Sequence, residues 1–210
     1  MVGEQLRRRG IRDERVLQAM QEVPRHQFVP EVVRDRAYED SPLPIGKTET
    51  ISQPYIVAAM TEAVRIEPHS KVLEVGAGSG YQAAILAHMG AKVWSLERNP
   101  ELAKQARERL ERLGYGPVQV ISTDGSKGYP PAAPYDVIMV TAAAPQVPPV
   151  LLEQLSDGGR LLIPVGDLHH QDLHLLTRKD DRFITQVLDP CQFVPLVGAY
   201  GWPEDGEWIQ

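Results

Sequence analysis

The stretch from Val72 to Gly80, which reads VLEVGAGSG, constrains the fold of this chain more than any other. Its first half is a short apolar run with the length and composition of a buried β-strand. The alternating glycines that follow permit a sharp turn and let a ligand approach the backbone closely. A helix is expected to begin near Tyr81 and to end at Gly90. A strand, a glycine loop and a helix N-terminus in this order are typical of a nucleotide-binding corner in an α/β protein.

The spacing of the glycines leaves several interpretations open. Counted from Gly76, the loop is G-x-G-x-G with Gly78 and Gly80, which suits S-adenosylmethionine because that ligand has no pyrophosphate to seat. Counted from Gly78, the loop also matches the dinucleotide pattern G-x-G-x-x-G/A with Ala83 last, but two extra residues then separate the strand from its first glycine. A nicotinamide-dependent oxidoreductase, a noncatalytic nucleotide-binding module and a glycine turn without a ligand remain alternatives.

Strands and helices alternate downstream, as in a parallel sheet covered by helices on both faces. We expect a helix from Pro100 with Asn99 as its N-cap, a helix near 150–155, and a turn at Asp157-Gly158-Gly159. Upstream, Asp13 is expected to cap a helix in a leader that precedes the glycine corner. The expected strands are 72–75, 92–96, 118–122, 137–140, 161–163, 173–177 and 183–188.

Acidic residues follow two of these strands. Glu97 lies 17 residues beyond Gly80 (97 − 80 = 17), and an acid about 20 residues past such glycines commonly accepts hydrogen bonds from ribose hydroxyls. Asp124, followed by Gly125, stands at the end of the next strand, where open parallel sheets bind ligands. A surface acid at Glu97 and an ordinary turn at Asp124-Gly125 are the plainer alternatives.

A further helix is expected to begin at Ser52 or Gln53, because Pro54 suits a first helical turn. Ser52 has two interpretations. It is either a simple helix cap or a hydroxyl that, beside free backbone N–H groups, holds a carboxylate. The sequence pattern does not decide between them.

The composition sets broad limits. The chain has 210 residues, of which 42% are hydrophobic, and this is enough for one globular domain with a substantial core. A net charge of −6 argues against nonspecific nucleic-acid binding. Cys191 is the single cysteine, so an intramolecular disulfide is impossible and a cytoplasmic protein is expected. Neither a signal peptide nor a membrane span is expected. We expect no metal site at His169, His170 and His174, because no close set of cysteine or acidic ligands completes one.

Several motifs together resemble the protein-L-isoaspartate O-methyltransferase family over about residues 16–202. The glycine motif is shared by many methyltransferases, whereas TISQPY from Thr50 and FVPL from Phe193 are more specific. The other matching motifs are LER at 96–98, DG at 124–125, YD at 135–136, VTAAAP at 140–145 and GGRL at 158–161.

The resemblance implies a Rossmann-like class I methyltransferase fold: an open, mostly parallel, twisted sheet with helices on both faces and an N-terminal helical leader. It implies one domain over 1–210, with a substrate-side leader (1–70), a cofactor-binding core (71–166) and C-terminal strands with a substrate-side tail (167–210). Ser52 corresponds to the family's active-site serine. The implied cofactor residues are Gln53, Glu74, Gly76, Gly78, Gly80, Glu97, Asp124 and Gly125, and the implied substrate residues are Ser52, Val194, Pro195, Leu196 and Val197.

The family reaction transfers a methyl group from S-adenosylmethionine to the free α-carboxyl of an L-isoaspartyl residue, leaving S-adenosylhomocysteine. The expected partners are damaged proteins and peptides, with no nucleic acid or membrane, and the expected state is a monomer in the cytoplasm. Another class I methyltransferase, acting on RNA or a small molecule, is an alternative that gives no reason for the TISQP motif. One departure is visible: Lys47-Thr48-Glu49 stands where bacterial relatives usually have His-Gly-Gln.

Overall fold

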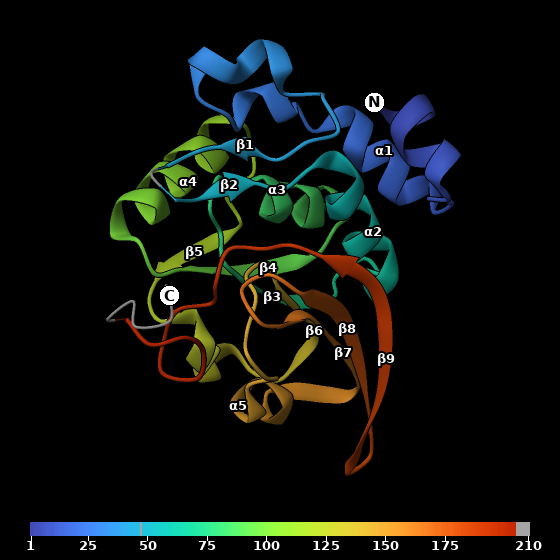
Figure 1. The fold of residues 1–210 in the computed structure, drawn as a ribbon, viewed down its shortest axis with the longest axis vertical. Coiled ribbons are helices and arrows are strands. Elements are labelled where there is room, and N and C mark those ends of the chain that lie inside the picture. Colours follow the sequence, from blue (N-terminus) through green and yellow to red (C-terminus); the bar gives the residue numbers. More distant parts are fainter. Residues whose placement is uncertain (47, 205–210) are drawn as a thin grey trace.

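The protein is described from a computed structural model that covers residues 1–46 and 48–204. Its centre is a seven-stranded sheet in the order β5-β4-β3-β6-β7-β8-β9 (Figure 1). The first five of these strands pair in parallel, and β8 and β9 are added antiparallel. The strands are β3 (Lys71–Val75), β4 (Lys92–Glu97), β5 (Gln119–Ser122), β6 (Tyr135–Val140), β7 (Leu155–Gly166), β8 (Gln171–Lys179) and β9 (Arg182–Cys191). The predicted Rossmann-like architecture, an open and mostly parallel sheet covered by helices, is confirmed.

Five α-helices and a small hairpin complete the described fold. The helices are α1 (Glu14–Glu22), α2 (Pro54–Val64), α3 (Tyr81–His88), α4 (Pro100–Arg112) and α5 (Pro149–Glu153). The hairpin pairs β1 (Leu43–Pro44) with β2 (Thr50–Ile51). Short 3₁₀ or π turns are η1 (Val2–Leu6), η2 (Arg7–Arg9), η3 (Arg25–Gln27), η4 (Glu31–Arg36), η5 (Gly125–Lys127) and η6 (Pro130–Ala132).

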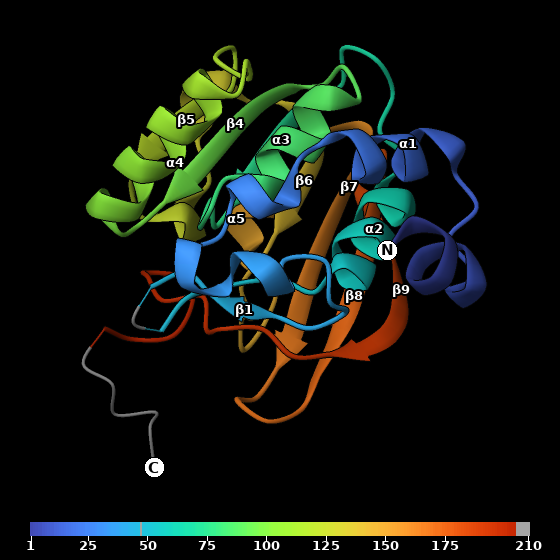
Figure 2. The same ribbon diagram turned by 90° about the horizontal axis from the view of Figure 1, so that it is seen from above.

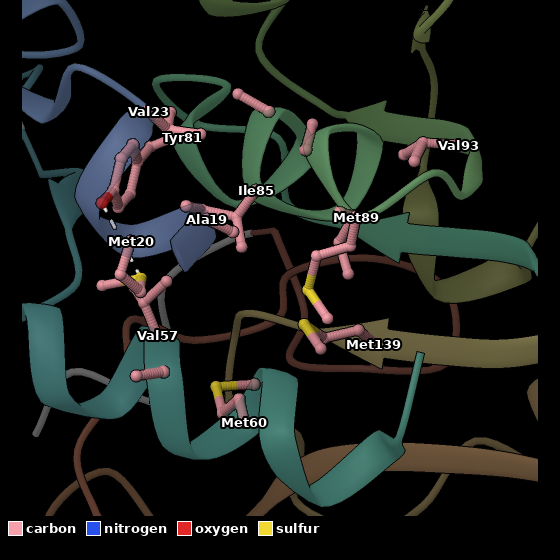
Figure 3. Packing of buried hydrophobic residues seen from close by; sticks show 14 of the residues in the cluster. Ala19, Met20, Val23, Val57, Met60, Tyr81, Ile85, Met89, Val93 and Met139 are labelled. Atoms are coloured by element: carbon pink, nitrogen blue, oxygen red, sulfur yellow. Dashed lines mark hydrogen bonds between the residues drawn. The ribbon is translucent and has the colours of Figure 1, made fainter. Parts of the chain in front are cut away.

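The strands are apolar on both faces because each face is covered. One face, which includes Val72, Val137 and Met139, packs against α1 to α4. Figure 3 shows this layer, with Met60 and Met89 near Met139 and with Tyr81 directed from α3 toward Met20 of α1. The opposite face forms a second cluster with α5, in which Leu73, Ile138, Leu161 and Leu151 are fully buried. The alternation of faces along each strand separates the two cores.

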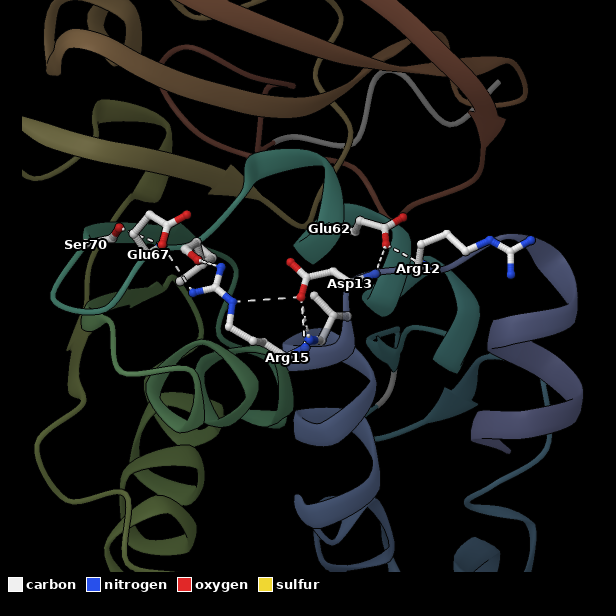
Figure 4. Close-up of polar contacts among 8 residues, drawn as sticks. Arg12, Asp13, Arg15, Glu62, Glu67 and Ser70 are labelled. Atoms are coloured by element: carbon white, nitrogen blue, oxygen red, sulfur yellow. Dashed lines mark hydrogen bonds and ion pairs between the residues drawn. The ribbon is translucent and has the colours of Figure 1, made fainter.

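The N-terminal helices are tied to the rest of the molecule by caps and ion pairs. The Asp13 carboxylate accepts the N–H of Arg15 at 2.8 Å, which confirms it as the N-cap of α1. Glu62 on α2 accepts the backbone N–H groups of Arg12 at 2.7 Å and Asp13 at 2.6 Å (Figure 4). The Arg15 guanidinium donates to Glu67 at 3.3 Å. These bonds hold the start of α1 against the C-terminal end of α2 and the residues that follow it.

The end of the parallel region differs from the prediction. Asp157-Gly158-Gly159 was expected as a turn before a strand, but it lies within β7 as an irregularity in its pairing with β6. Tyr135 pairs with Leu155, and Val137 pairs with Arg160, so four residues of β7 bulge out between the two pairs. β6 pairs with β7 on both sides of the bulge, and β8 pairs with it from Arg160 onward, which local sequence cannot show.

The order of the strands also positions a crevice. The chain runs outward from β3 to β4 and β5, then returns to place β6 on the other side of β3. Ligands of open α/β sheets bind at the carboxyl ends of the strands where the order reverses in this way. Figure 2 shows the β1 hairpin and the C-terminal coil gathered on one side of the sheet. Within the described residues no helix is long and apolar enough to cross a membrane.

Candidate active site

A cavity of about 430 Å³ opens where β3, β4 and β6 end. Its floor is the glycine loop after β3, and its walls come from the β2–α2 segment on one side and the coil 194–197 on the other. A volume of this size lies within the range of about 300–1,000 Å³ seen for small-molecule sites. The sheet therefore presents a ligand-sized cavity at the position that its strand order predicts.

The glycine loop is held in shape by the ends of the neighbouring strands. Gly76 and Gly78 have φ of +102° and +51°, which L-residues with side chains adopt rarely. Glu97 at the end of β4 accepts the Gly78 N–H through Oε2 at 2.9 Å and the Asn99 N–H through Oε1 at 2.9 Å. On the other side, the Thr141 hydroxyl donates to the Gly76 carbonyl at 2.7 Å. Hydrogen bonds to Glu97 and Thr141 therefore fix the loop conformation in the absence of a ligand.

Glu74 lies fully buried in β3 and lines the cavity. Burial raises the pKa of its carboxyl to about 8, and the nearby Glu97 charge adds to this, although the Ser95 hydroxyl donates a hydrogen bond that opposes the shift. Its Oε1 atom has no hydrogen-bond partner among the described residues. A buried acceptor on a cavity wall that has no partner in the protein can accept a hydrogen bond from a ligand in the cavity.

Gln82 forms a second acceptor of this kind at the first turn of α3. Its side-chain amide donates to the Thr61 hydroxyl at 3.0 Å, and Thr61 in turn donates to the Val57 carbonyl at 2.7 Å. The Gln82 Oε1 atom is buried without a partner in the described part of the chain. Because the amide nitrogen is fixed by α2, the oxygen is left available for a ligand in the cavity that Gln82 lines.

Ser52 stands between β2 and α2 and lines the cavity. The N-cap position of α2 is Gln53, with Pro54 as the first helical residue, and no side chain caps this helix. The expectation that a helix begins here is confirmed, and the interpretation of Ser52 as a simple cap is wrong. The Ser52 carbonyl accepts a hydrogen bond of 2.7 Å from the Arg25 guanidinium, which fixes the backbone of this cavity-lining residue.

The coil 194–197 forms the facing wall. It is anchored to the end of β6, because the Ala143 N–H donates to the Val194 carbonyl at 2.8 Å and the Leu196 N–H donates to the Ala143 carbonyl at 2.7 Å. Leu196 and Val197 are nearly fully buried. Backbone pairing thus brings a segment from the far C-terminal region beside the TISQP segment, and the two are 142 residues apart (194 − 52 = 142).

Asp124, unlike Glu74 and Glu97, does not line the cavity. Its carboxylate accepts the Ser126 N–H at 3.0 Å and hydroxyl at 2.7 Å, and it also accepts the Ala199 N–H at 3.0 Å. Burial raises the pKa of this carboxyl, but the hydrogen bonds from Ala199 and Ser126 outweigh it and lower the pKa below the ordinary value. Asp124 therefore fastens the C-terminal coil, and its neighbour Gly125 lines the cavity.

The structure brings most of the candidate residues together. Those lining the cavity are Ser52, Glu74, Gly76, Gly78, Glu97, Gly125, Val194, Pro195, Leu196 and Val197. Gln53, Gly80 and Asp124 are not among the lining residues: Gly80 is the N-cap of α3, and Gln53 is that of α2.

Some lining residues were not singled out from the sequence. They include Gln82, Tyr81, Thr48 and Glu49. The departure from the family pattern at 47–49 was a signal for the last two. Glu49 accepts hydrogen bonds from the Thr48 N–H at 3.1 Å and the Asn99 side chain at 3.4 Å. Lys47 lies outside the described residues. No comparable signal marked Gln82 or Tyr81, because helical residues next to a glycine loop are ordinarily assigned to packing.

The fold and the cavity define the class: a Rossmann-like protein of the class I methyltransferase type, with a ligand-sized cavity over the glycine loop that follows β3. The family description that matches residues 1–201 is protein-L-isoaspartate(D-aspartate) O-methyltransferase. The chain belongs to this family.

Named relatives agree with this assignment. The chain is 55% identical over 202 residues to protein-L-isoaspartate O-methyltransferase of Methanoculleus marisnigri, covering 96% of this chain and 92% of the relative. It is 50% identical over 202 residues to protein-L-isoaspartate O-methyltransferase 1 of Syntrophobacter fumaroxidans, covering 96% and 94%.

Solved structures give the same result. One protein-L-isoaspartate O-methyltransferase superposes with a TM-score of 0.82 at 31% identity, covering 90% of this chain and 62% of that one. A putative protein-L-isoaspartate O-methyltransferase from Plasmodium falciparum, in complex with S-adenosyl-L-homocysteine, superposes with a TM-score of 0.79 at 28% identity, covering 92% and 95%. A precorrin-6y C5,15-methyltransferase of Geobacter metallireducens, 13% identical with a TM-score of 0.53, shares the fold alone.

Proposed function

We propose that this protein transfers a methyl group from S-adenosylmethionine to the free α-carboxyl of L-isoaspartyl residues in damaged proteins and peptides. The observation that carries the proposal is the meeting of Ser52 with the glycine loop in one cavity, in a chain that belongs to the isoaspartate methyltransferase family. The product ester closes to a succinimide without the enzyme, and hydrolysis returns part of it to normal aspartate. The proposed role is therefore protein repair.

The cavity has the chemistry that S-adenosylmethionine needs. Glu74 Oε1 and Gln82 Oε1 are buried acceptors without partners, and both residues line the cavity. Such acceptors suit the donors and positive charge of the cofactor's methionine end. Glu97 retains lone pairs for ribose hydroxyls beyond the two N–H groups it already accepts. When bound, the cofactor supplies a methyl group made electrophilic by the attached sulfonium.

The residues of this chain have to orient the substrate more than activate it. An α-carboxyl has a pKa of about 3.3–3.7 and is already an anion at neutral pH, so no strong base is required. Ser52 donates a hydrogen bond that orients the carboxylate, and the apolar wall at 194–197 excludes water from it. Correct orientation can contribute about 7–11 kcal/mol in favourable intramolecular cases.

The position of the loop supports S-adenosylmethionine over a nicotinamide dinucleotide. β3 ends at Val75, and Gly76 follows at once with φ of +102°. The turn therefore uses the G-x-G-x-G spacing that begins at Gly76. The spacing that begins at Gly78 would start the dinucleotide pattern two residues too late for the turn.

The experiment is a methyl-transfer assay with labelled S-adenosylmethionine on two peptides that differ only in one isoaspartyl or aspartyl linkage. The two peptides have the same composition and charge, so any discrimination comes from the shape of the site around the carboxylate. We expect labelling of the isoaspartyl peptide alone. Equal labelling of both peptides, or labelling of neither while an RNA or small-molecule acceptor is methylated, would refute the proposal.

We further propose that residues 1–210 work as one domain, because residues of the leader, the core and the tail line the same cavity. We also propose that the protein acts as a monomer. The net charge of −6 supports a protein substrate over nucleic acid. The single cysteine supports action in the cytoplasm. Sedimentation of the purified protein tests the monomer.

A further inference from the structure

Behind the Ser52 wall of the cavity lies a fully buried arginine that the proposed reaction has not yet used. Arg25 in η3 has no exposed surface. Its Nε donates to the Ala37 carbonyl at 2.7 Å and its Nη2 to the Ser52 carbonyl at 2.7 Å. Its Nη1 is buried and has no hydrogen-bond partner among the described residues. Arg25 is thus fixed by two backbone carbonyls and not by an acid.

The charge of Arg25 is not neutralised by a direct ion pair within residues 1–46 and 48–204. Asp40 contributes an attraction to it, but Asp40 already forms an ion pair with Arg9 and accepts the Tyr55 N–H at 3.1 Å. Burial lowers the pKa of the guanidinium, which still stays protonated at any physiological pH. Buried charges in proteins are normally paired, so an unpaired one needs a reason.

The guanidinium lies directly behind two residues that line the cavity. One is Ser52, through the hydrogen bond to its carbonyl. The other is Tyr81, whose ring centroid is 5.0 Å from the Arg25 guanidinium carbon. Figure 3 shows Tyr81 at the start of α3, directed away from the sheet toward α1. The positive charge therefore lies behind the part of the cavity wall that Ser52 and Tyr81 form.

We propose that Arg25 is the positioning residue for the substrate carboxylate. Its two hydrogen bonds hold the Ser52 backbone against the 37–40 turn, so the hydroxyl keeps one direction. Its unpaired charge makes the Ser52 side of the cavity favour an anion, and the carboxylate of the substrate is that anion. This inference rests on the proposed function, since it takes the isoaspartyl carboxylate as the ligand.

The expected effect is large because the charge is buried. A unit charge one residue away, acting through an effective dielectric constant of about 20, changes the affinity for an anion by roughly tenfold to a hundredfold. The effect on S-adenosylhomocysteine should be smaller, because the hydrogen bonds of Arg25 go to the carbonyls of Ala37 and Ser52 and not to the glycine loop or Glu97. If Arg25 were purely structural, its substitution would lower the stability of the protein and would affect the binding of peptide and S-adenosylhomocysteine to the same extent.

The test compares Arg25→Met, which removes the charge at similar volume, with Arg25→Lys, which keeps the charge but loses the forked donors. Arg34→Met on the exposed η4 turn is the matched control. For each protein we would measure Tm, the Kd of S-adenosylhomocysteine by calorimetry, and kcat and KM for the isoaspartyl peptide. We expect Arg25→Met to raise KM tenfold to a hundredfold with the Kd changed less than threefold. We expect Arg25→Lys to have a KM close to that of the wild type and a lower kcat.

Two outcomes would overturn the inference: an unchanged peptide KM in folded Arg25→Met, or an equal loss of affinity for peptide and S-adenosylhomocysteine. If the variants do not fold, the wild-type protein can still be used to test whether the site recognises the negative charge of the substrate carboxylate. A peptide whose isoaspartyl α-carboxyl is replaced by a carboxamide should compete at least tenfold more weakly than the carboxylate, and equal competition would refute the inference. A wild type that methylates neither peptide refutes the proposed function itself, whereas an active wild type with indifferent variants refutes only the role of Arg25.

Discussion

The Glu97 carboxylate accepts the Gly78 N–H at 2.9 Å, so the acid that ends β4 also fixes the glycine loop that follows β3. Its second oxygen accepts the Asn99 N–H at 2.9 Å, at the start of α4. One side chain thus links two strand ends and a helix at the floor of the cavity. Any ribose contact that Glu97 makes is added to a carboxylate that is already oriented.

Replacing Glu97 by Ala should weaken the binding of S-adenosylmethionine and S-adenosylhomocysteine by about 1.5–3 kcal/mol, the usual loss for hydrogen bonds to a charged group. Calorimetry measures the change directly. Glu108→Ala, at an exposed position of α4, is the control and should bind normally. Normal cofactor binding by Glu97→Ala, or tight binding of NAD by the wild type, would contradict the assignment of the site.

Ser52→Ala should bind the cofactor nearly normally and transfer methyl groups tenfold to a hundredfold more slowly, because one hydrogen bond to a charged oxygen contributes roughly 1.5–3 kcal/mol. The structure adds a second expectation. Since no side chain caps α2, the substitution should leave Tm almost unchanged. Normal turnover by folded Ser52→Ala would refute the proposed role of the hydroxyl in orienting the carboxylate.

Asp124→Ala should release the coil that carries Ala199, because the carboxylate accepts both the Ala199 and Ser126 N–H groups. We expect a loss of about 1–3 kcal/mol in the free energy of unfolding. We also expect weaker cofactor binding, because the same coil continues into the wall at 194–197. Hydrogen exchange at Ala199 should accelerate in Asp124→Ala and less in Asp124→Asn. Unchanged exchange would rule out this fastening role.

Glu74 should make stability depend on pH. Its pKa is about 8 in the folded protein and about 4.5 when unfolded, so the folded state holds one more proton between these values. Stability from this group is therefore complete below about pH 4.5 and falls as pH rises toward 8, by at most about 1.4 kcal/mol per pH unit.

The variant Glu74→Gln removes this titration. The difference in unfolding free energy between wild type and variant, measured in urea at several pH values from 5 to 9, should grow in favour of the variant as pH rises. A constant difference would show that Glu74 does not titrate in that range.

The sequence alone determined the features that depend on neighbours along the chain. The glycines at 76, 78 and 80, the caps Asp13 and Asn99, and the apolar runs of the strands all act within a few residues, and each lies where it was expected. Local propensity and the alternation of covered faces are physical properties of short segments, so they can be recognised in one dimension.

Only the tertiary structure decided what the side chains at those positions contact. Asp124 fastens Ala199, 75 residues away, and the bulge in β7 lies between two residues that pair with β6, Leu155 and Arg160. The raised pKa of Glu74 comes from the layers that bury β3, and the place of Arg25 behind Ser52 comes from the packing of η3 against the β2–α2 segment. Burial and long-range hydrogen bonding depend on tertiary contacts between segments that are distant in the chain, and local sequence patterns do not show those contacts.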